Sequence, residues 1–223
     1  MIAMPSIQRT FVTIPSGRIE LEGVCGFEPQ RQRGPGVVIC HPHPLMGGSM
    51  DNNVVQALFE ESVRQGFVAL AFNFRGTGRS GGTFEGGQGE VQDVLAALDW
   101  LAARERTRNQ RLGVLGYSFG AWIGLQAAHR DPGRVSLTGA VAPPAGLFPF
   151  DFLAGYPGFF FFVFGDRDPY CPLEKEATLL AGPAARREGK ILAGSDHFFW
   201  NRESEAARFL CGRFRATLAA LPE

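Results

Sequence analysis

The chain has 223 residues, of which 22 are Lys or Arg and 22 are Asp or Glu, so its formal net charge is zero at pH 7. That length suits a single domain, expected to span residues 1–223, which can bury roughly 70% of the surface of its unfolded chain. The even charge balance excludes the basic excess typical of nucleic-acid-binding proteins and the polybasic arms that bind anionic lipid.

Cysteine spacing and the first residues bear on the cellular compartment. The cysteines stand far apart in the sequence and are expected to be free thiols: Cys25, Cys40, Cys171 and Cys211. Residues 1–10 lack the charged start and apolar stretch of a signal peptide, and no apolar run is long enough to span a bilayer. The sequence therefore predicts a cytoplasmic protein with no membrane partner and no nucleic-acid partner.

Short apolar segments alternate with helix-forming segments along most of the chain. Strands are predicted at residues 7–14, 19–27, 36–40, 67–72, 112–117, 137–142 and 159–164, and a last short strand ends at 190–193. Helices are predicted from an N-cap at Asp51 to Gln65, after Ser118 to near residue 131, and at residues 90–103, 173–181 and 202–218. This alternation predicts an α/β fold: a mostly parallel sheet with helices on both faces and an N-terminal antiparallel hairpin.

The stretch Gly116-Tyr117-Ser118-Phe119-Gly120 joins a predicted strand to a predicted helix. A serine at the apex of such a sharp turn is the layout of a nucleophile elbow. The turn forces the serine into a strained backbone conformation, and the glycines two residues to either side leave room for it. The alternative is a glycine-rich turn with an ordinary serine N-cap. We interpret Ser118 as a catalytic nucleophile.

An acid and a histidine follow Ser118 at the ends of later predicted strands. Asp166 and Asp168 come after the strand at residues 159–164, and His197 comes after the last strand. Because the carboxyl ends of parallel strands meet at one edge of a sheet, these side chains are expected to converge. His197 is then the general base and Asp168 orients its imidazole. Asp166 remains the alternative acid, although its place directly after a glycine favours capping of the turn.

Two backbone N–H groups are expected to bind the oxyanion that forms on a substrate carbonyl. The first belongs to Phe119, the residue after the nucleophile. The second is expected in the loop that follows the third predicted strand, where Pro42 and Pro44 have no N–H. Of the remaining candidates, His43 and Leu45, we prefer His43 because it is nearer the strand end.

Two other groups of polar residues have structural interpretations. His41 and His43 could bind a metal, but no nearby Cys, Asp or Glu completes a ligand set, so no metal and no cofactor is predicted. Arg75, at the end of a predicted strand, is expected to form a buried ion pair with Glu90 and Asp93 of the following helix. The alternative for Arg75 is a clamp on a substrate carboxylate.

Three further motifs carry a resemblance to a known family. They are HPHP at residues 41–44 with Gly47, Gly48 and Asn53, FNFRGTGRS at residues 72–80, and GQGE at residues 87–90 with Asp93. With the serine elbow, they make the chain resemble the α/β-hydrolase superfamily, and more narrowly its small lidless bacterial group. The resemblance covers residues 36–223 and implies a serine hydrolase whose triad falls on Ser118, Asp168 and His197.

The connection at residues 143–158 is where larger members of the superfamily insert a lid, and here it is too short for a helical cap domain. Apolar residues near the expected site predict an open, shallow, apolar pocket. The candidate pocket residues are Leu45, Met46, Phe148, Phe150 and Phe198.

Together these features predict a serine hydrolase that cleaves carboxylic esters of short or medium acyl chains through an acyl-enzyme. Its partner is then a small acyl ester, it needs no cofactor, and it is compatible with a homodimer. The alternatives are a thioesterase or peptidase that uses the same triad, and a hydrolase-fold binding protein without turnover.

Overall fold

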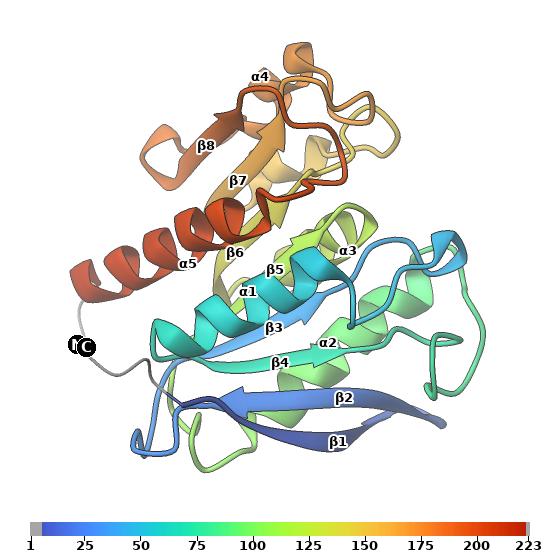
Figure 1. Ribbon diagram of the computed structural model, residues 1–223, viewed down its shortest axis with the longest axis vertical. Helices are drawn as coiled ribbons and strands as arrows, with labels where there is room; N and C mark the ends of the chain where they lie inside the picture. The colour runs from blue at the N-terminus through green and yellow to red at the C-terminus, as the bar shows by residue number, and fades with distance from the viewer. Residues whose placement is uncertain (1–5, 222–223) are drawn as a thin grey trace.

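The computed structural model describes residues 6–221, in which eight strands form one sheet with helices around it (Figure 1). Residues 1–5 lie outside this range, and they make up half of the segment on which the signal-peptide prediction rests. Both ends of the predicted domain also lie outside it. Among the helices within it, none combines the length and the apolar character needed to cross a bilayer.

The elements follow the predicted alternation of strands and helices. The strands are β1 (Gln8–Ser16), β2 (Ile19–Phe27), β3 (Gly36–Cys40), β4 (Val68–Phe72), β5 (Leu112–Tyr117), β6 (Val135–Val141), β7 (Phe159–Gly165) and β8 (Arg187–Leu192). The α-helices are α1 (Asn53–Arg64), α2 (Gln88–Ala102), α3 (Phe119–Arg130), α4 (Glu176–Leu179) and α5 (Glu203–Ala220). Short 3₁₀ helices are η1 (Pro44–Met46), η2 (Asp151–Gly155), η3 (Leu173–Lys175) and η4 (Ala184–Arg186).

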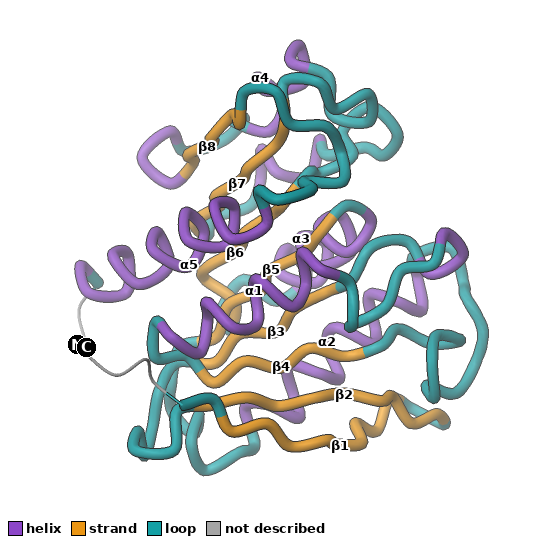
Figure 2. The backbone as a smooth tube through the Cα atoms, in the orientation of Figure 1, coloured by secondary structure: helices purple, strands orange, loops and turns teal. Residues whose placement is uncertain are grey.

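The order of strands across the sheet is β1-β2-β4-β3-β5-β6-β7-β8. β1 and β2 form an antiparallel hairpin, β2 pairs antiparallel with β4, and the remaining neighbours pair in parallel. The predicted fold class, with its N-terminal hairpin, is confirmed. Parallel pairing aligns the carboxyl ends of the strands from β3 to β8, and the loops that follow them gather at one end of the sheet (Figure 2).

Apolar cores lie on both faces of the sheet. α1 and α5 cover one face, and α2 and α3 cover the other (Figure 1). The central strands β3, β4 and β5 are buried along their whole length, which explains why they are continuous apolar runs and not alternating ones. The loops at the carboxyl ends of these strands therefore begin at strands that are covered on both faces.

Two helix assignments differ from the sequence prediction. α1 begins after an N-cap at Asn52, whose side chain accepts the Val54 N–H at 3.0 Å, while the predicted cap, Asp51, lies in the preceding turn. Asp and Asn are equally good N-caps, so the sequence does not rank two neighbours of these types. The helix predicted at residues 173–181 is instead the 3₁₀ helix η3 followed by the single turn α4.

Arg187, at the start of β8, holds the connection at residues 143–158 in place. Its guanidinium is buried and donates to the carbonyl oxygens of Leu153, Tyr156 and Gly158 at 3.1, 2.5 and 2.6 Å. Burial lowers the pKa of this arginine, and the carbonyl oxygens replace the water that its charge has lost. Between residues 143 and 158 the connection contains the short η2 and no cap domain.

The ion pair predicted for Arg75 forms with only one of its two expected partners in α2. Arg75 Nε and Nη2 donate to the two oxygens of Asp93 at 3.0 and 2.8 Å, and Nη1 donates to Glu85 at 2.5 Å. Glu90 was predicted wrongly as a partner: its carboxylate accepts the N–H groups of Glu85 and Gly87, at 2.8 and 2.6 Å, and caps the start of α2. The Asp93 side chain is fully buried, so this pair is part of the scaffold.

Replacing Arg75 with methionine should lower the free energy of unfolding by about 3–5 kcal/mol, because the buried Asp93 carboxylate loses its cation. Turnover of a neutral ester should remain nearly unchanged. Urea unfolding measures the first effect, and Arg79→Met, at a side chain that is 91% exposed, is the matched control. Normal stability together with a selective loss on carboxylate-bearing esters would instead support a substrate clamp.

Candidate active site

Ser118 stands between β5 and α3 with φ 54° and ψ −121°, a positive-φ conformation that is strained for a residue with a side chain. The neighbouring segments approach so closely that only glycine fits. A Cβ on Gly116 would lie 2.4 Å from the Gly120 carbonyl oxygen. A Cβ on Gly120 would lie 2.4 Å from the carbonyl oxygens of Cys40 and His41. Packing therefore requires the two glycines of the sequence motif.

The structure brings together the serine, acid and histidine selected from chain order. Ser118 follows β5, Asp168 follows β7 and His197 follows β8. His197 Nε2 lies 2.9 Å from Ser118 Oγ, and His197 Nδ1 lies 2.8 Å from Asp168 Oδ2. With its proton on Nδ1, the imidazole donates to the carboxylate and accepts from the serine hydroxyl. This geometry can remove a proton from the hydroxyl.

The two candidate acids have different partners. Asp168 is 4% exposed, and its Oδ1 accepts the N–H groups of Tyr170 and Cys171 at 2.8 and 3.2 Å, which leaves Oδ2 for His197. Asp166 is exposed, and its Oδ1 accepts the Gly194 N–H at 2.7 Å. Asp168 therefore contacts the imidazole, whereas Asp166 caps a turn between the loops that follow β7 and β8.

Tyr117 is a supporting residue that the sequence analysis did not identify. Its hydroxyl donates to the His197 carbonyl oxygen at 2.9 Å, and burial raises the pKa of Tyr117 above its ordinary value, which keeps the phenol a neutral donor. The Tyr170 ring packs edge-on against the His197 imidazole, with ring centroids 4.7 Å apart. The only sequence signal for Tyr117 was the position of this residue directly before Ser118.

The candidate oxyanion donors lie at two adjacent segments. Phe119 is the first residue of α3, and His43 is the N-cap of η1. Within residues 6–221, neither of their N–H groups donates to a protein acceptor. The Leu45 N–H, the alternative second donor, is already bound to His43 Nδ1 at 3.2 Å. The arrangement therefore leaves the Phe119 and His43 N–H groups available to a ligand oxygen.

His41 is a structural residue of the same loop. It is fully buried, its Nε2 accepts the Phe74 N–H at 3.0 Å, and its Nδ1 donates to the Pro42 carbonyl oxygen at 2.6 Å. Burial lowers the pKa of His41 to about 4, although the hydrogen bond to Pro42 opposes the shift. Both ring nitrogens are thus occupied by the backbone, and the imidazole is neutral near pH 7.

A neutral buried His41 makes the stability depend on pH. Its pKa falls from 6.5 to about 4 on folding, so the associated stability is present above pH 6.5 and is lost as the pH falls toward 4. The loss should reach about 3 kcal/mol, at about 1.4 kcal/mol per pKa unit. Urea unfolding at pH 7 and pH 4 measures this loss. The variant His41→Gln keeps an acceptor for the Phe74 N–H, and between these pH values its free energy of unfolding should fall by about 3 kcal/mol less than that of the native protein. Equal losses in the two proteins would contradict this interpretation.

The predicted pocket residues divide into surface and core. Three are exposed at the candidate site: Leu45 (71%), Met46 (83%) and Phe198 (54%). Phe148 is partly buried and stacks on Trp122, with ring centroids 4.3 Å apart. Phe150 is only 2% exposed and belongs to the core on the α2 and α3 face, so its assignment to a pocket was wrong. An apolar residue in a connection has the same sequence pattern whether it covers the core or faces solvent.

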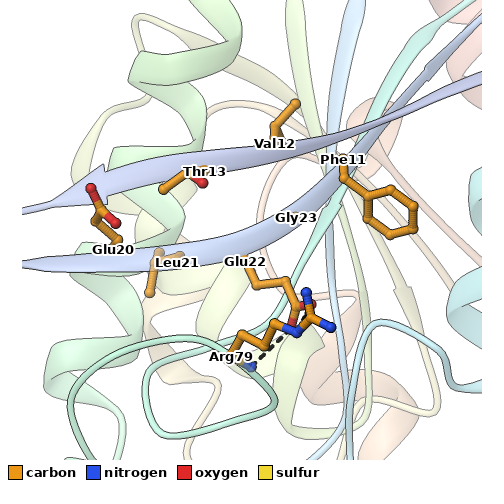
Figure 3. A pocket seen from close by; sticks show the side chains of 8 residues that line it. All are labelled: Phe11, Val12, Thr13, Glu20, Leu21, Glu22, Gly23 and Arg79. Atoms are coloured by element: carbon orange, nitrogen blue, oxygen red, sulfur yellow. Dashed lines mark hydrogen bonds and ion pairs between the residues drawn. The ribbon is translucent and has the colours of Figure 1, made fainter.

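A separate surface hollow of about 450 Å³ lies along the hairpin, where residues of β1 and β2 and the side chain of Arg79 line it (Figure 3). Glu22 Oε2 accepts from the Arg79 N–H and from the Asn73 side chain, each at 2.9 Å. The polar groups of this hollow hold the loop after β4 against β2, and none of the candidate site residues lines it.

Comparison with known proteins gives consistent results. Residues 27–150 match the model of the X-Pro dipeptidyl-peptidase (S15 family). An uncharacterised protein of Rickettsia prowazekii is 36% identical over 202 residues, which cover 87% of this chain and 83% of that protein. An α/β serine hydrolase homologue from Coxiella burnetii is 31% identical, with a TM-score of 0.82 over 92% of this chain and 96% of the other. A serine hydrolase without a lid from Xanthomonas campestris is 26% identical, with a TM-score of 0.79 over 93% and 95%.

The fold and the serine elbow define a serine-type hydrolase of the α/β-hydrolase superfamily. The chain belongs to the family of the X-Pro dipeptidyl-peptidase (S15) model and, within the superfamily, to the small lidless group. The family match ends at residue 150, before Asp168 and His197. Its name describes a peptidase and does not by itself define the substrate of this chain.

Proposed function

We propose that the protein is a carboxylesterase, a serine hydrolase that cleaves esters of short or medium acyl chains through an acyl-enzyme. The observation that carries the proposal is the continuous hydrogen-bonded series from Ser118 Oγ through His197 to Asp168, with contacts of 2.9 and 2.8 Å. Such a triad activates a serine hydroxyl, which is a weak nucleophile on its own.

In the proposed reaction, Ser118 Oγ attacks the carbonyl carbon of the ester while His197 Nε2 takes the hydroxyl proton. Asp168 holds the imidazole in the required tautomer and stabilises the imidazolium. His197 then gives the proton to the leaving alkoxide, and the acyl group stays on Ser118. A water molecule, deprotonated by His197, hydrolyses the acyl-enzyme and restores the serine.

The negative charge on the attacked carbonyl oxygen is proposed to bind the N–H groups of Phe119 and His43. Their lack of protein acceptors within residues 6–221 supports this role. α3 begins at Phe119, so the positive end of its helix dipole also faces the developing charge. Donors that are already in place need no rearrangement when the charge forms.

Exposed apolar side chains near the triad support an acyl substrate. They belong to the loops after β3, β6 and β8: Leu45, Met46, Leu147, Phe198 and Trp200. An acyl chain or an apolar alcohol group that covers such surface stabilises the enzyme–substrate complex. The family match favours a second candidate, cleavage after an X-Pro dipeptide by the same triad.

The cellular location, the substrate partner and the oligomeric state are also part of the proposal. Cys25, Cys40, Cys171 and Cys211 are free and buried, which supports the reducing, cytoplasmic location predicted from the sequence. The proposed partner is a small acyl ester, and the homodimer stays a prediction.

Ser118→Ala and His197→Ala should each lower kcat by about 10⁴-fold or more, because each removes one member of a triad that acts as a unit. The measurement uses p-nitrophenyl acetate, butyrate and octanoate beside an acyl thioester and Ala-Pro p-nitroanilide, with circular dichroism to verify folding. Turnover of the esters that survives either change would contradict the proposal.

Two other outcomes would select the alternatives. Turnover confined to Ala-Pro p-nitroanilide would identify a peptidase, and turnover confined to the thioester would identify a thioesterase. A folded native protein that hydrolyses none of the substrates and whose Ser118 does not react with a fluorophosphonate would identify a binding protein.

Asp168→Asn should lower kcat by about 10⁴-fold, because the amide favours the wrong imidazole tautomer. Asp166→Asn is the matched control at a nearby carboxylate, and it should retain most of the native kcat because an amide oxygen still accepts the Gly194 N–H. Steady-state kinetics on the best ester of the panel measures both. A larger loss in Asp166→Asn than in Asp168→Asn would reverse the assignment of the acid.

A further inference from the structure

The side chain of His43 makes contacts that its predicted role as a backbone donor does not require. Its Nδ1 accepts the Leu45 N–H at 3.2 Å and so caps the start of η1. Its carbonyl oxygen accepts the N–H groups of Met46 and Gly48, each at 3.0 Å. The imidazole and the carbonyl oxygen of His43 thus tie the η1 turn to His43, whose N–H is proposed to bind the oxyanion.

The imidazole ring of His43 also contacts the elbow. Its centroid lies 4.8 Å from the ring of Phe119 and 4.9 Å from the ring of Phe84. Phe119 is 1% exposed and also contacts Trp122 and Phe148, with centroids 5.9 and 6.0 Å away. The His43 ring therefore lies against a fixed aromatic cluster and sets the spacing between the two segments that carry the donors.

The loop around His43 has little freedom to find another path. A Cβ on Gly48 would lie 2.1 Å from the Pro42 carbonyl oxygen, and Gly47 has φ 80° at the end of η1. Pro42 and Pro44 fix φ on both sides of His43. The hydrogen bond from the Leu45 N–H to His43 Nδ1 completes this set of constraints on the backbone of His43.

His43 must be neutral for Nδ1 to accept a hydrogen bond. Burial lowers the pKa of His43, while the charge of Glu90 opposes that shift, and the neighbouring His41 is neutral near pH 7. The aromatic rings that contact it, Phe84 and Phe119, carry no charge. The proton of the neutral ring is then on Nε2.

We propose that the His43 imidazole is a positioning residue, which fixes the His43 N–H for the oxyanion by accepting the Leu45 N–H. This inference rests on the proposed esterase function. An oxyanion donor stabilises the transition state and not the bound substrate, so its displacement lowers kcat and leaves KM nearly unchanged. The sequence predicted a role for the backbone N–H of His43 and none for its imidazole in the oxyanion hole.

Three substitutions separate the acceptor from the ring. His43→Asn places an amide oxygen where Nδ1 lies and removes the ring, His43→Phe keeps a ring without an acceptor, and His43→Ala removes both. His43→Ala and His43→Phe should lower kcat by about 10- to 100-fold, within the range for a misplaced or lost donor, with KM within about threefold. His43→Asn should recover most of that loss. His129→Asn, the same change on α3, is the control and should keep the native kcat.

The outcomes distinguish this inference from the function on which it rests. A native kcat in His43→Phe, equal losses in His43→Asn and His43→Phe, or an effect on KM alone would overturn the role of the imidazole. If His43→Ala does not fold, the comparison of the Asn and Phe variants decides the question. A native protein that hydrolyses none of the esters, the thioester or the anilide would overturn the proposed function, and the positioning role with it.

Discussion

The strained backbone at Ser118 is the constraint on which the candidate site depends. A positive φ of 54° persists only where the surroundings enforce it, and here Gly116 and Gly120 allow β3, β5 and α3 to approach within distances that no other residue permits. The same turn therefore lifts the serine hydroxyl out of the sheet and sets the Phe119 N–H beside it. Nucleophile and donor are fixed by one local packing arrangement.

The rest of the site is tied to this turn by buried polar contacts. The Tyr117 hydroxyl binds the carbonyl oxygen of His197, so the residue before the nucleophile positions the loop of the base. The carboxylate of Asp168 is oriented by backbone N–H groups at 2.8 and 3.2 Å before it meets the imidazole. Each member is held by a group on its own loop or on the elbow, which preserves the short distances without a lid to compress them.

Features set by local sequence were predictable, and features set by distant partners were not. Apolar runs identified the strands, and the order of Ser118, Asp168 and His197 along the chain brought together residues that the structure places in contact. Glu90 is an exception, because its partners Gly87 and Glu85 are only three and five residues away and form the local capping pattern of α2. The burial of Phe150 depends on segments far away in sequence, which composition does not encode. The role of Tyr117 could not be predicted for the same reason, because its partner lies 80 residues away.

The division between buried and exposed groups suggests how substrate preference and chemistry are separated in this molecule. The acid, the base and one proposed oxyanion donor are buried: Asp168 is 4% and His197 8% exposed, and Phe119 is 1% exposed. The apolar side chains that a substrate would meet, such as Met46 and Trp200, are among the most exposed in the described chain. Substitutions at exposed positions usually change stability little. Substrate preference can therefore change through residues such as Met46 and Trp200 while the triad keeps its geometry. Phe198 belongs to both sets, because its exposed ring lies 5.9 Å from that of His197.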